Sequence, residues 1–252
     1  MPEGDTVWRA ARALHTALAG GVLVRCDLRV PRFATSDLSG RAVLDVTPHG
    51  KHLLTRVEGG LTLHSHLGME GAWKVYGTDR RWGGGPPHEI RAVLGTGSAT
   101  AVGYRLKVLE LIRTAQEERV VGHLGPDLLG PDWDAATALS NLLADPARPV
   151  GEALLDQRNL AGVGNIFKSE ACFVARANPW TPVGEVREPE RLVDAAKRLL
   201  ELNKRLSSGS RRLHVSGRRN LPCPRCRTLI RKAPQQDRPT YWCPRCQPSP
   251  TP

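Results

Sequence analysis

The second residue of the chain is the one whose type and place allow chemistry. Removal of the initiator methionine before Pro2 leaves a secondary amine at the N-terminus. Such an amine can attack an electrophilic carbon and form an iminium, as lysine amines do in Schiff bases. Its pKa lies near ~8, below the ~10.4 of lysine, so more of it is neutral at pH 7. Glu3 follows it and can shuttle protons. Most chains that begin Met-Pro, however, lose the methionine without any catalytic role for the proline, so Pro2 and Glu3 alone do not establish catalysis.

Four of the six cysteines form two short knuckles near the C-terminus. The first knuckle is Cys-Pro-Arg-Cys from Cys223 to Cys226. The second has the same sequence from Cys243 to Cys246, and sixteen residues separate the two. This spacing is typical of a four-thiolate zinc ribbon, in which no coordination position stays open. We therefore expect one structural zinc ion per chain, with disulfides as the weaker alternative in a reducing compartment. The two other cysteines are expected to be small buried side chains: Cys26 and Cys172.

A third motif is the glycine-bearing stretch Leu-Ala-Gly-Val-Gly-Asn at residues 160–165. It joins two expected helices by a tight turn, with Asn165 at the start of the second helix. Glycines let backbone N–H groups approach a phosphate closely, and a helix N-terminus favours an anion. The alternative is that Asn165 is only an N-cap and the glycines only a turn.

The positive charge of the chain is concentrated near its C-terminus. The formal net charge is +11, from 36 basic and 25 acidic residues. Between Lys197 and Cys246 there are 14 basic residues and only 2 acidic ones, so this stretch holds essentially the whole excess. Such a block predicts a polyanionic partner, with a solvated basic tail as the alternative. Because cysteines and turn residues replace an amphipathic apolar stripe, nucleic acid is favoured over a membrane surface.

The overall composition is that of a soluble globular protein, with 40% hydrophobic and 24% charged residues. No apolar run approaches the ~20 residues that a membrane-spanning helix needs, so we expect no membrane partner. The N-terminus lacks a basic stretch followed by an apolar core, so no signal peptide is predicted. We expect a cytoplasmic protein, associated with the nucleoid in a bacterium.

Hydrophobic spacing predicts a β-rich first half and a helical second half. A helix is predicted at residues 5–19, capped by Asp5 and ended by a glycine pair. Short apolar runs between turn residues then predict a sandwich or barrel, with residues 79–87 as a loop. The expected strands are 22–30, 42–46, 52–57, 61–66, 72–75, 90–94 and 107–112. The later helices are expected at 133–143, 150–160, 165–175 and 188–206.

Four markers in this order resemble one family of bacterial repair enzymes. They are Pro-Glu-Gly at 2–4, Gly-Lys-His-Leu-Leu at 50–54, the turn at 160–165, and the ribbon ending Tyr-Trp-Cys-Pro-Arg-Cys-Gln at 241–247. The chain resembles the formamidopyrimidine-DNA glycosylase and endonuclease VIII family, and its Pro-Glu-Gly start is more similar to the endonuclease VIII branch. The markers span nearly the whole chain, so the resemblance covers it.

The resemblance implies an α+β multidomain fold. Residues 1–115 would form an N-terminal β-sandwich catalytic domain with an N-terminal helix, and residues 116–130 a linker. Residues 131–206 would form a helix–two-turn–helix DNA-binding domain, and residues 207–252 a flexible loop and a zinc finger. DNA would bind between the two parts.

The resemblance also implies roles for single residues. Pro2 is the nucleophile at the deoxyribose anomeric carbon, and Glu3 is the proton shuttle. Lys51, on a β-turn, reaches the site and helps to protonate or hold the lesion strand. Asn165 and Arg238, the latter on the zinc hairpin, bind phosphates that flank the flipped nucleotide.

The sequence departs from the family pattern at several positions. Thr6 replaces the second glutamate of many relatives, so that carboxylate is missing unless Asp5 substitutes for it. The sequence His-Leu-Gly-Met at 66–69 matches a wedge loop of the formamidopyrimidine branch and makes Met69 the expected intercalating residue. The other void-filling residues of that branch have no clear counterpart near residues 103–107.

The resulting hypothesis is a bifunctional DNA glycosylase and AP lyase. It would remove oxidised bases, with pyrimidines preferred, through a Schiff base at Pro2 and β,δ-elimination. We expect a monomer whose partner is damaged DNA. The rival hypothesis is a non-catalytic zinc-finger module that binds damaged DNA. Because mere binding needs none of Pro2, Glu3 and Lys51, the three together favour the enzyme.

Overall fold

The structure is a computed structural model that describes residues 2–78, 80–206, 210–211 and 213–249. It divides into two compact units, Met1–His123 and Leu124–Pro252. The expected linker, 116–130, thus contains the division point. Met1 and residues 250–252 lie outside the described residues, as do parts of the expected loops at 79–87 and 207–220.

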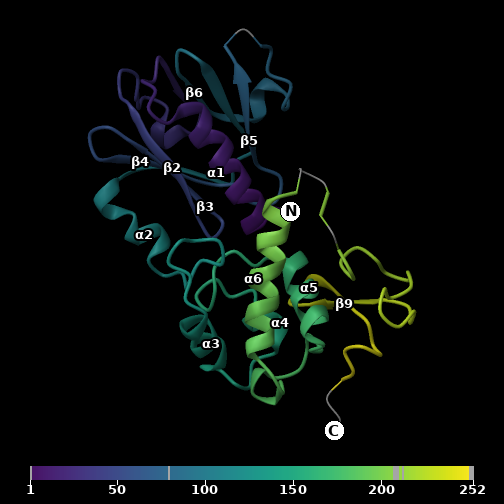
Figure 1. Cartoon of the computed structure of the whole chain (residues 1–252). Coiled ribbons are helices and arrows are strands. Elements are labelled where there is room, and N and C mark those ends of the chain that lie inside the picture. The colour runs from purple at the N-terminus through teal and green to yellow at the C-terminus, as the bar shows by residue number, and fades with distance from the viewer. Residues whose placement is uncertain (1, 79, 207–209, 212, 250–252) are drawn as a thin grey trace. The chain divides into compact units, whose positions relative to one another are not determined.

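The first unit is a sandwich of two four-stranded antiparallel sheets (Figure 1). One sheet has the order β2-β3-β4-β8 and the other β1-β6-β7-β5. The strand bounds are β1 Arg25–Leu28, β2 Val43–His49, β3 His52–Val57, β4 Leu61–His66, β5 Ala72–Gly77, β6 Ile90–Gly95, β7 Ala99–Tyr104 and β8 Val108–Arg113. Short helices lie at Pro31–Phe33, Pro87–Glu89, Thr114–Gln116 and, as α2, Glu118–Val121. The expected β-sandwich is therefore confirmed.

Helix α1, Gly4–Leu18, packs against β2 and β5 and closes the core of the sandwich. Its apolar side chains recur at helical spacing and are buried with residues from both sheets. The members from α1 are Val7, Ala11, Leu14 and Leu18. This packing fixes the direction of the helix, so the residues just before Gly4 have a defined place in the unit.

Two details of the first unit differ from expectation. Strand β7 was not predicted, because Ala99–Tyr104 is rich in small residues and includes Gly103, which weakens the pattern of a strand. It is nevertheless central between β6 and β5 and largely buried. Asp5 is not the helix cap: Glu3 occupies that position, and the Asp5 carboxylate accepts from Arg9 inside the helix.

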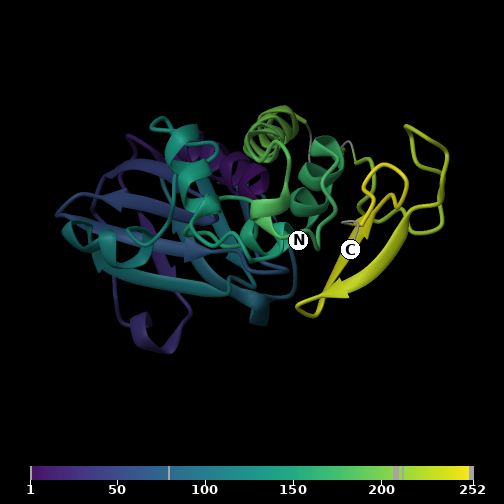
Figure 2. The ribbon, with the colours of Figure 1, turned by 90° about the horizontal axis from the view of Figure 1, so that it is seen from below.

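The second unit combines helices with a small hairpin. The helices are α3 Ala135–Leu143, α4 Val150–Ala153, α5 Asn165–Ala175 and α6 Glu190–Lys204, with a 3-10 turn at Val183–Glu185. The hairpin strands are β9 Arg231–Gln235 and β10 Arg238–Trp242. Figure 2 shows the hairpin as a two-stranded ribbon, and α5 contacts β10. No helix of the described residues is long and apolar enough to cross a membrane.

The helix expected at 150–160 is wrong beyond Ala153. Polar side chains bond to the backbone there and compete with the helix. Asn159 donates to the Ala153 carbonyl at 2.9 Å, and the Asp156 carboxylate accepts from the Arg158 amide at 3.0 Å. The segment therefore forms an irregular connection between α4 and the glycine turn.

Candidate functional site

The N-terminal residues lie at the start of α1. Glu3 is the N-cap residue and is fully buried, and its carbonyl accepts from the Thr6 and Val7 amides at 2.9 and 3.0 Å. Pro2 is half-buried beside it. A buried carboxylate next to the position of a terminal amine is the arrangement that proton transfer to and from that amine requires.

The carboxylate of Asp5 is already engaged by its own helix. Asp5 is fully buried, and its carboxylate pairs with Arg9 at 3.3 Å. The Thr6 hydroxyl donates to the same carboxylate at 3.2 Å. The two residues thus form one hydrogen-bonded group with Arg9 at the first turn of α1.

Lys51 lies on the tight turn between β2 and β3. The turn has two residues, Gly50 and Lys51, closed by the pair His49 and His52. Gly50 has φ +57°, a left-handed conformation that favours glycine in hairpin turns. The ammonium of Lys51 is close enough to depress the pKa of His66. The hairpin thus holds Lys51 at one end of the sheet, among histidines.

Those histidines form a cluster that sequence reasoning missed: His52, His64, His66 and His123. The Nδ1 of His52 lies 2.8 Å from Nε2 of His64, and their rings stack with centroids 5.1 Å apart. Burial, followed by the charges of neighbouring histidines, lowers the pKa of His52 to about 3. Burial and then the Lys51 charge lower the pKa of His66 to about 4. His52 and His66 are therefore neutral at pH 7.

A signal for the cluster exists in the sequence. His64 and His66 are two residues apart in β4, so both side chains point to one face, and His52 pairs directly with His66 across the strands. Reading this required the register of β3 and β4, which periodicity alone does not supply.

Met69 lies on the loop between β4 and β5 and is 64% exposed. The Gly68 amide donates to Nδ1 of His66 at 2.9 Å, and the Gly71 amide donates to the Leu67 carbonyl at 2.9 Å. Arg105 also donates to the carbonyl of Glu70 in this loop, at 3.3 Å. The thioether is thus presented on a braced loop, as a wedge requires.

In the second unit, Gln157 organises the glycine turn, a role that sequence reasoning missed. Its Nε2 donates to the carbonyls of Leu155 and Val163 at 2.8 and 2.9 Å. Its Oε1 accepts from the Gly162 amide at 3.1 Å, where φ is +110°. One amide side chain thus fixes the turn that leads into α5.

Asn165 is the first residue of α5, and Gly164 is the N-cap. Asn165 is therefore not the cap. Its Nδ2 donates to the Pro239 carbonyl on β10 at 2.7 Å, and its buried Oδ1 has no hydrogen-bond partner among the residues that the structure describes. Arg238 is the neighbour of Pro239 and is exposed. The structure thus brings Asn165 and the hairpin end that carries Arg238 together.

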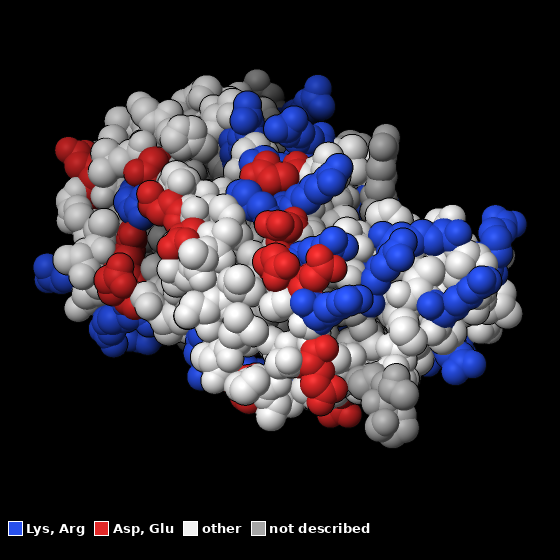
Figure 3. Space-filling model, turned by 60° about the horizontal axis from the view of Figure 1, so that its bottom comes forward, with Lys and Arg blue, Asp and Glu red and all other residues white. Residues whose placement is uncertain are grey.

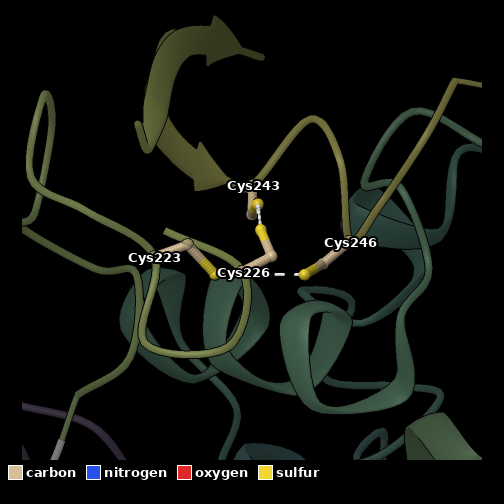
Figure 4. A group of neighbouring side chains, drawn as sticks. All are labelled: Cys223, Cys226, Cys243 and Cys246. Carbon is tan, nitrogen blue, oxygen red and sulfur yellow. Dashed lines mark hydrogen bonds between the residues drawn. The ribbon is translucent and has the colours of Figure 1, made fainter. Parts of the chain in front are cut away.

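The four cysteines of the two knuckles converge (Figure 4). Their sulfur atoms all lie within 4.8 Å of one another. Cys223 and Cys246 are 3.9 Å apart, and Cys226 and Cys243 are 3.4 Å apart. Zn–S bonds of about 2.3 Å in a tetrahedron place sulfurs about 3.8 Å apart. These distances fit a zinc ion and exceed the ~2.05 Å of a disulfide.

The remaining two cysteines are not part of this site. Cys172 is fully buried in α5, and burial raises the pKa of its thiol to about 12. Cys26 is half-buried against the core of the sandwich, and burial likewise raises the pKa of its thiol. Both are therefore protonated at pH 7 and unreactive.

The part of the second unit that bears the zinc site is strongly basic. Figure 3 shows Lys and Arg side chains gathered over it, with few acidic ones. Its exposed basic residues are Arg219, Arg225, Arg227, Arg231, Lys232, Arg238 and Arg245. Such a surface attracts a polyanion.

Family models match along nearly the whole chain. The "Formamidopyrimidine-DNA glycosylase N-terminal domain" matches residues 1–125, the "Formamidopyrimidine-DNA glycosylase H2TH domain" residues 124–213, and the "Zinc finger found in FPG and IleRS" residues 220–248. The fold and the cysteine site together therefore define a helix–two-turn–helix protein with a zinc finger. The chain belongs to the formamidopyrimidine-DNA glycosylase and endonuclease VIII family.

Curated relatives place it on the endonuclease VIII branch. The chain is 63% identical to "Probable endonuclease 8 2" of Streptomyces coelicolor, over 100% of this chain and 96% of that protein. It is 49% identical to "DNA-(apurinic or apyrimidinic site) lyase Nei2" of Mycolicibacterium smegmatis, over 98% and 99%. These relatives and the four clustered sulfurs confirm the expected family and its structural zinc.

Solved structures share the fold. The Lactococcus lactis Fpg in complex with DNA that contains N7-benzyl-Fapy-dG has a TM-score of 0.86 at 23% identity. The same enzyme in complex with abasic DNA has a TM-score of 0.85 at 22% identity. Both matches cover 98% of this chain and 100% of that chain.

Proposed function

We propose that this protein is a base-excision DNA glycosylase with AP-lyase activity that acts on oxidised bases, pyrimidines above all. The observation that carries the proposal is the buried Glu3 beside Pro2 at the start of α1, in a chain whose relatives include a named AP lyase. A protein that only bound damaged DNA would need no carboxylate buried beside its terminal residue. The non-catalytic alternative is therefore not favoured.

The chemistry begins at the terminal amine. With Met1 removed, the neutral nitrogen of Pro2 attacks C1′ of the damaged nucleotide, and the bond from C1′ to the base breaks. Glu3 takes the proton that the Pro2 nitrogen loses and gives it to the sugar ring oxygen, so the ring opens and an iminium remains between Pro2 and C1′. Loss of a C2′ proton then expels the 3′ phosphate, and a second elimination expels the 5′ phosphate. Hydrolysis of the iminium frees Pro2.

Lys51 assists as a cation at the end of the sheet. Its side chain helps to hold or protonate the lesion strand, and the neutral histidines next to it add no competing positive charge. Base extrusion costs a few kcal/mol, and the exposed Met69 occupies the vacated stack.

The second unit supplies the grip on DNA. Asn165 at the start of α5 and Arg238 on the hairpin bind phosphates beside the extruded nucleotide, and the zinc ion holds the hairpin. The zinc ion is structural, because all four coordination positions are taken by cysteine. The protein acts as a monomer on damaged DNA.

Borohydride trapping on duplex DNA with one abasic site tests the proposal. Borohydride reduces the iminium to a stable amine, so the protein with Pro2 exposed should form a covalent adduct with the DNA. Pro2→Gly should reduce the adduct at least tenfold, and protein that keeps Met1 should form none. Adducts of undiminished yield in both variants would place the nucleophile elsewhere.

A further inference from the structure

The four-cysteine site lies far along the chain from the hairpin end that carries Arg238. Arg238 precedes Cys243 by five residues of nearly continuous strand. At about 3.3 Å per residue, that separation is about 16 Å. A two-stranded hairpin is marginally stable alone. The metal site therefore fixes the base of the hairpin but leaves the position of its tip to other contacts.

Helix α5 supplies those contacts along one face. Asn165 donates to the Pro239 carbonyl at 2.7 Å, and the Ser169 hydroxyl accepts from the Tyr241 amide at 3.4 Å. Between them, Nζ of Lys168 donates to Oγ1 of Thr240 at 2.6 Å. The helix thus bonds to three consecutive residues of β10.

Two successive hydrogen bonds link Lys168 to the backbone of Arg238. The Thr240 hydroxyl, which accepts from Lys168, donates to the Arg238 carbonyl at 3.4 Å. Lys168 also reaches Oε1 of Gln235 at 3.5 Å, and Gln235 pairs directly with Arg238 across the hairpin. Gln235 in turn donates to the Pro179 carbonyl at 2.9 Å. The ammonium group therefore holds both strands at the tip.

The burial of Lys168 argues for a specific role. Lysine is rarely buried completely, yet Lys168 and Thr240 are both fully buried. Removing an ammonium from water is costly and must be offset by directed hydrogen bonds. A residue that only filled space here would be apolar, because an apolar side chain of the same length carries no such cost.

We propose that Lys168 is a positioning residue for Arg238, and that it sets where the hairpin tip presents its guanidinium to a DNA phosphate. The inference rests on the proposed function, since it assumes that Arg238 grips DNA. Helix α5 would then have two roles. Asn165 at its N-terminus binds a phosphate, and Lys168 holds the zinc hairpin in the position in which Arg238 can bind another.

The test is a double-mutant cycle with Lys168→Met and Arg238→Ala, measured as the Kd for undamaged duplex and its salt dependence. If Lys168 acts through Arg238, Lys168→Met should weaken binding by about five- to tenfold, and the slope of log K against log[salt] should be shallower by about one. The double variant should then bind within about twofold of Arg238→Ala alone, because the two changes remove one contact.

Lys197→Met is the matched control. Lys197 is another hydrogen-bonded lysine of this unit: its Nζ donates to the Leu128 carbonyl at 2.6 Å and to Glu201 at 3.1 Å, and among the described residues it makes no hydrogen bond to the hairpin. Its effect on the Kd should be the same with and without Arg238→Ala, because the two residues share no contact. Zinc content should stay at one ion per chain in Lys168→Met. If that variant does not fold, Thr240→Val removes the same link without changing the volume of the side chain.

The outcomes separate the inference from the proposed function. Losses that multiply in the double variant, or a Lys168→Met protein that folds and binds as tightly as the parent, would overturn the positioning role. If Arg238→Ala itself leaves the Kd unchanged, the proposed phosphate contact fails and the positioning role fails with it. Borohydride trapping reports on Pro2 independently of both.

Discussion

The buried histidines of the first unit differ from the buried Lys168 and Glu170 of the second. In the first unit, the histidines beside Lys51 are held neutral, and the pKa of His52 and His66 is lowered to about 3 and about 4. In the second, Lys168 and Glu170 are fully buried, each with several hydrogen bonds. Glu170, for example, accepts from the amides of His214, Val215 and Ser216 at 2.7 to 2.8 Å.

The difference matches two tasks. Neutral histidines add no further positive charge beside Lys51, whose own charge already lowers the pKa of His66. Phosphate binding needs side chains in fixed positions. The hydrogen bonds of the buried Lys168 and Glu170 hold the segments around α5 in place. Changes in the first unit should therefore alter chemistry, whereas changes in the second should alter DNA affinity.

Glu3→Gln should have the largest effect and should separate chemistry from binding. Base excision should fall about 10²- to 10³-fold, because the amide cannot donate or accept the transferred proton. Strand cleavage at a preformed abasic site should fall less, since the base is already gone. Single-turnover rates on the two substrates measure this. An equal loss on both, or a raised Kd, would contradict the assignment.

Loss of zinc should weaken DNA binding and leave the chemistry at Pro2 unchanged. Cys223→Ser breaks the four-sulfur site, so the hairpin should lose its base and the Kd for duplex should rise about tenfold or more. The variant should still form the borohydride adduct at saturating abasic DNA, because Pro2 is in the other unit. Metal analysis gives the control: zinc should fall from one ion per chain toward none. Unchanged affinity in zinc-free protein would contradict the structural role.

Met69→Ala should have a smaller and substrate-dependent effect. Excision from duplex should slow by about tenfold, because no side chain fills the vacated stack. Excision from single strands should slow less, and the salt slope should not change, because a thioether releases no counterions. Comparison of the two rates decides the point. Equal slowing on both substrates would show that Met69 is not the wedge.

The histidine cluster should make stability fall in acid. In the unfolded chain His52 takes up a proton near pH 6.5, whereas in the folded protein burial lowers its pKa to about 3. Below pH 6.5 protons therefore favour the unfolded state, and the loss continues until about pH 3. At pH 5 it amounts to about 2 kcal/mol for His52. Urea unfolding at pH 7 and pH 5 should show this drop, and His52→Phe should reduce it. An equal drop in the variant would contradict the burial argument.

The sequence by itself determined those features whose cause is local. Strands β3 and β4 and helix α5 have the predicted bounds, because glycines in the flanking turns mark where each element begins or ends. The zinc quartet was readable because each knuckle is four residues long and the metal needs four thiolates. The roles of Pro2, Glu3, Lys51, Met69, Asn165 and Arg238 stay predictions.

Tertiary structure alone decided the rest. Strand β7 exists because neighbouring strands pair with it on both sides, which outweighs its weak propensity. The contact of His52 with His64 and that of Lys168 with Thr240 join residues 12 and 72 positions apart in the chain. Sequence spacing predicts neighbours within one element, whereas contacts between elements depend on register and packing, which only the folded chain defines.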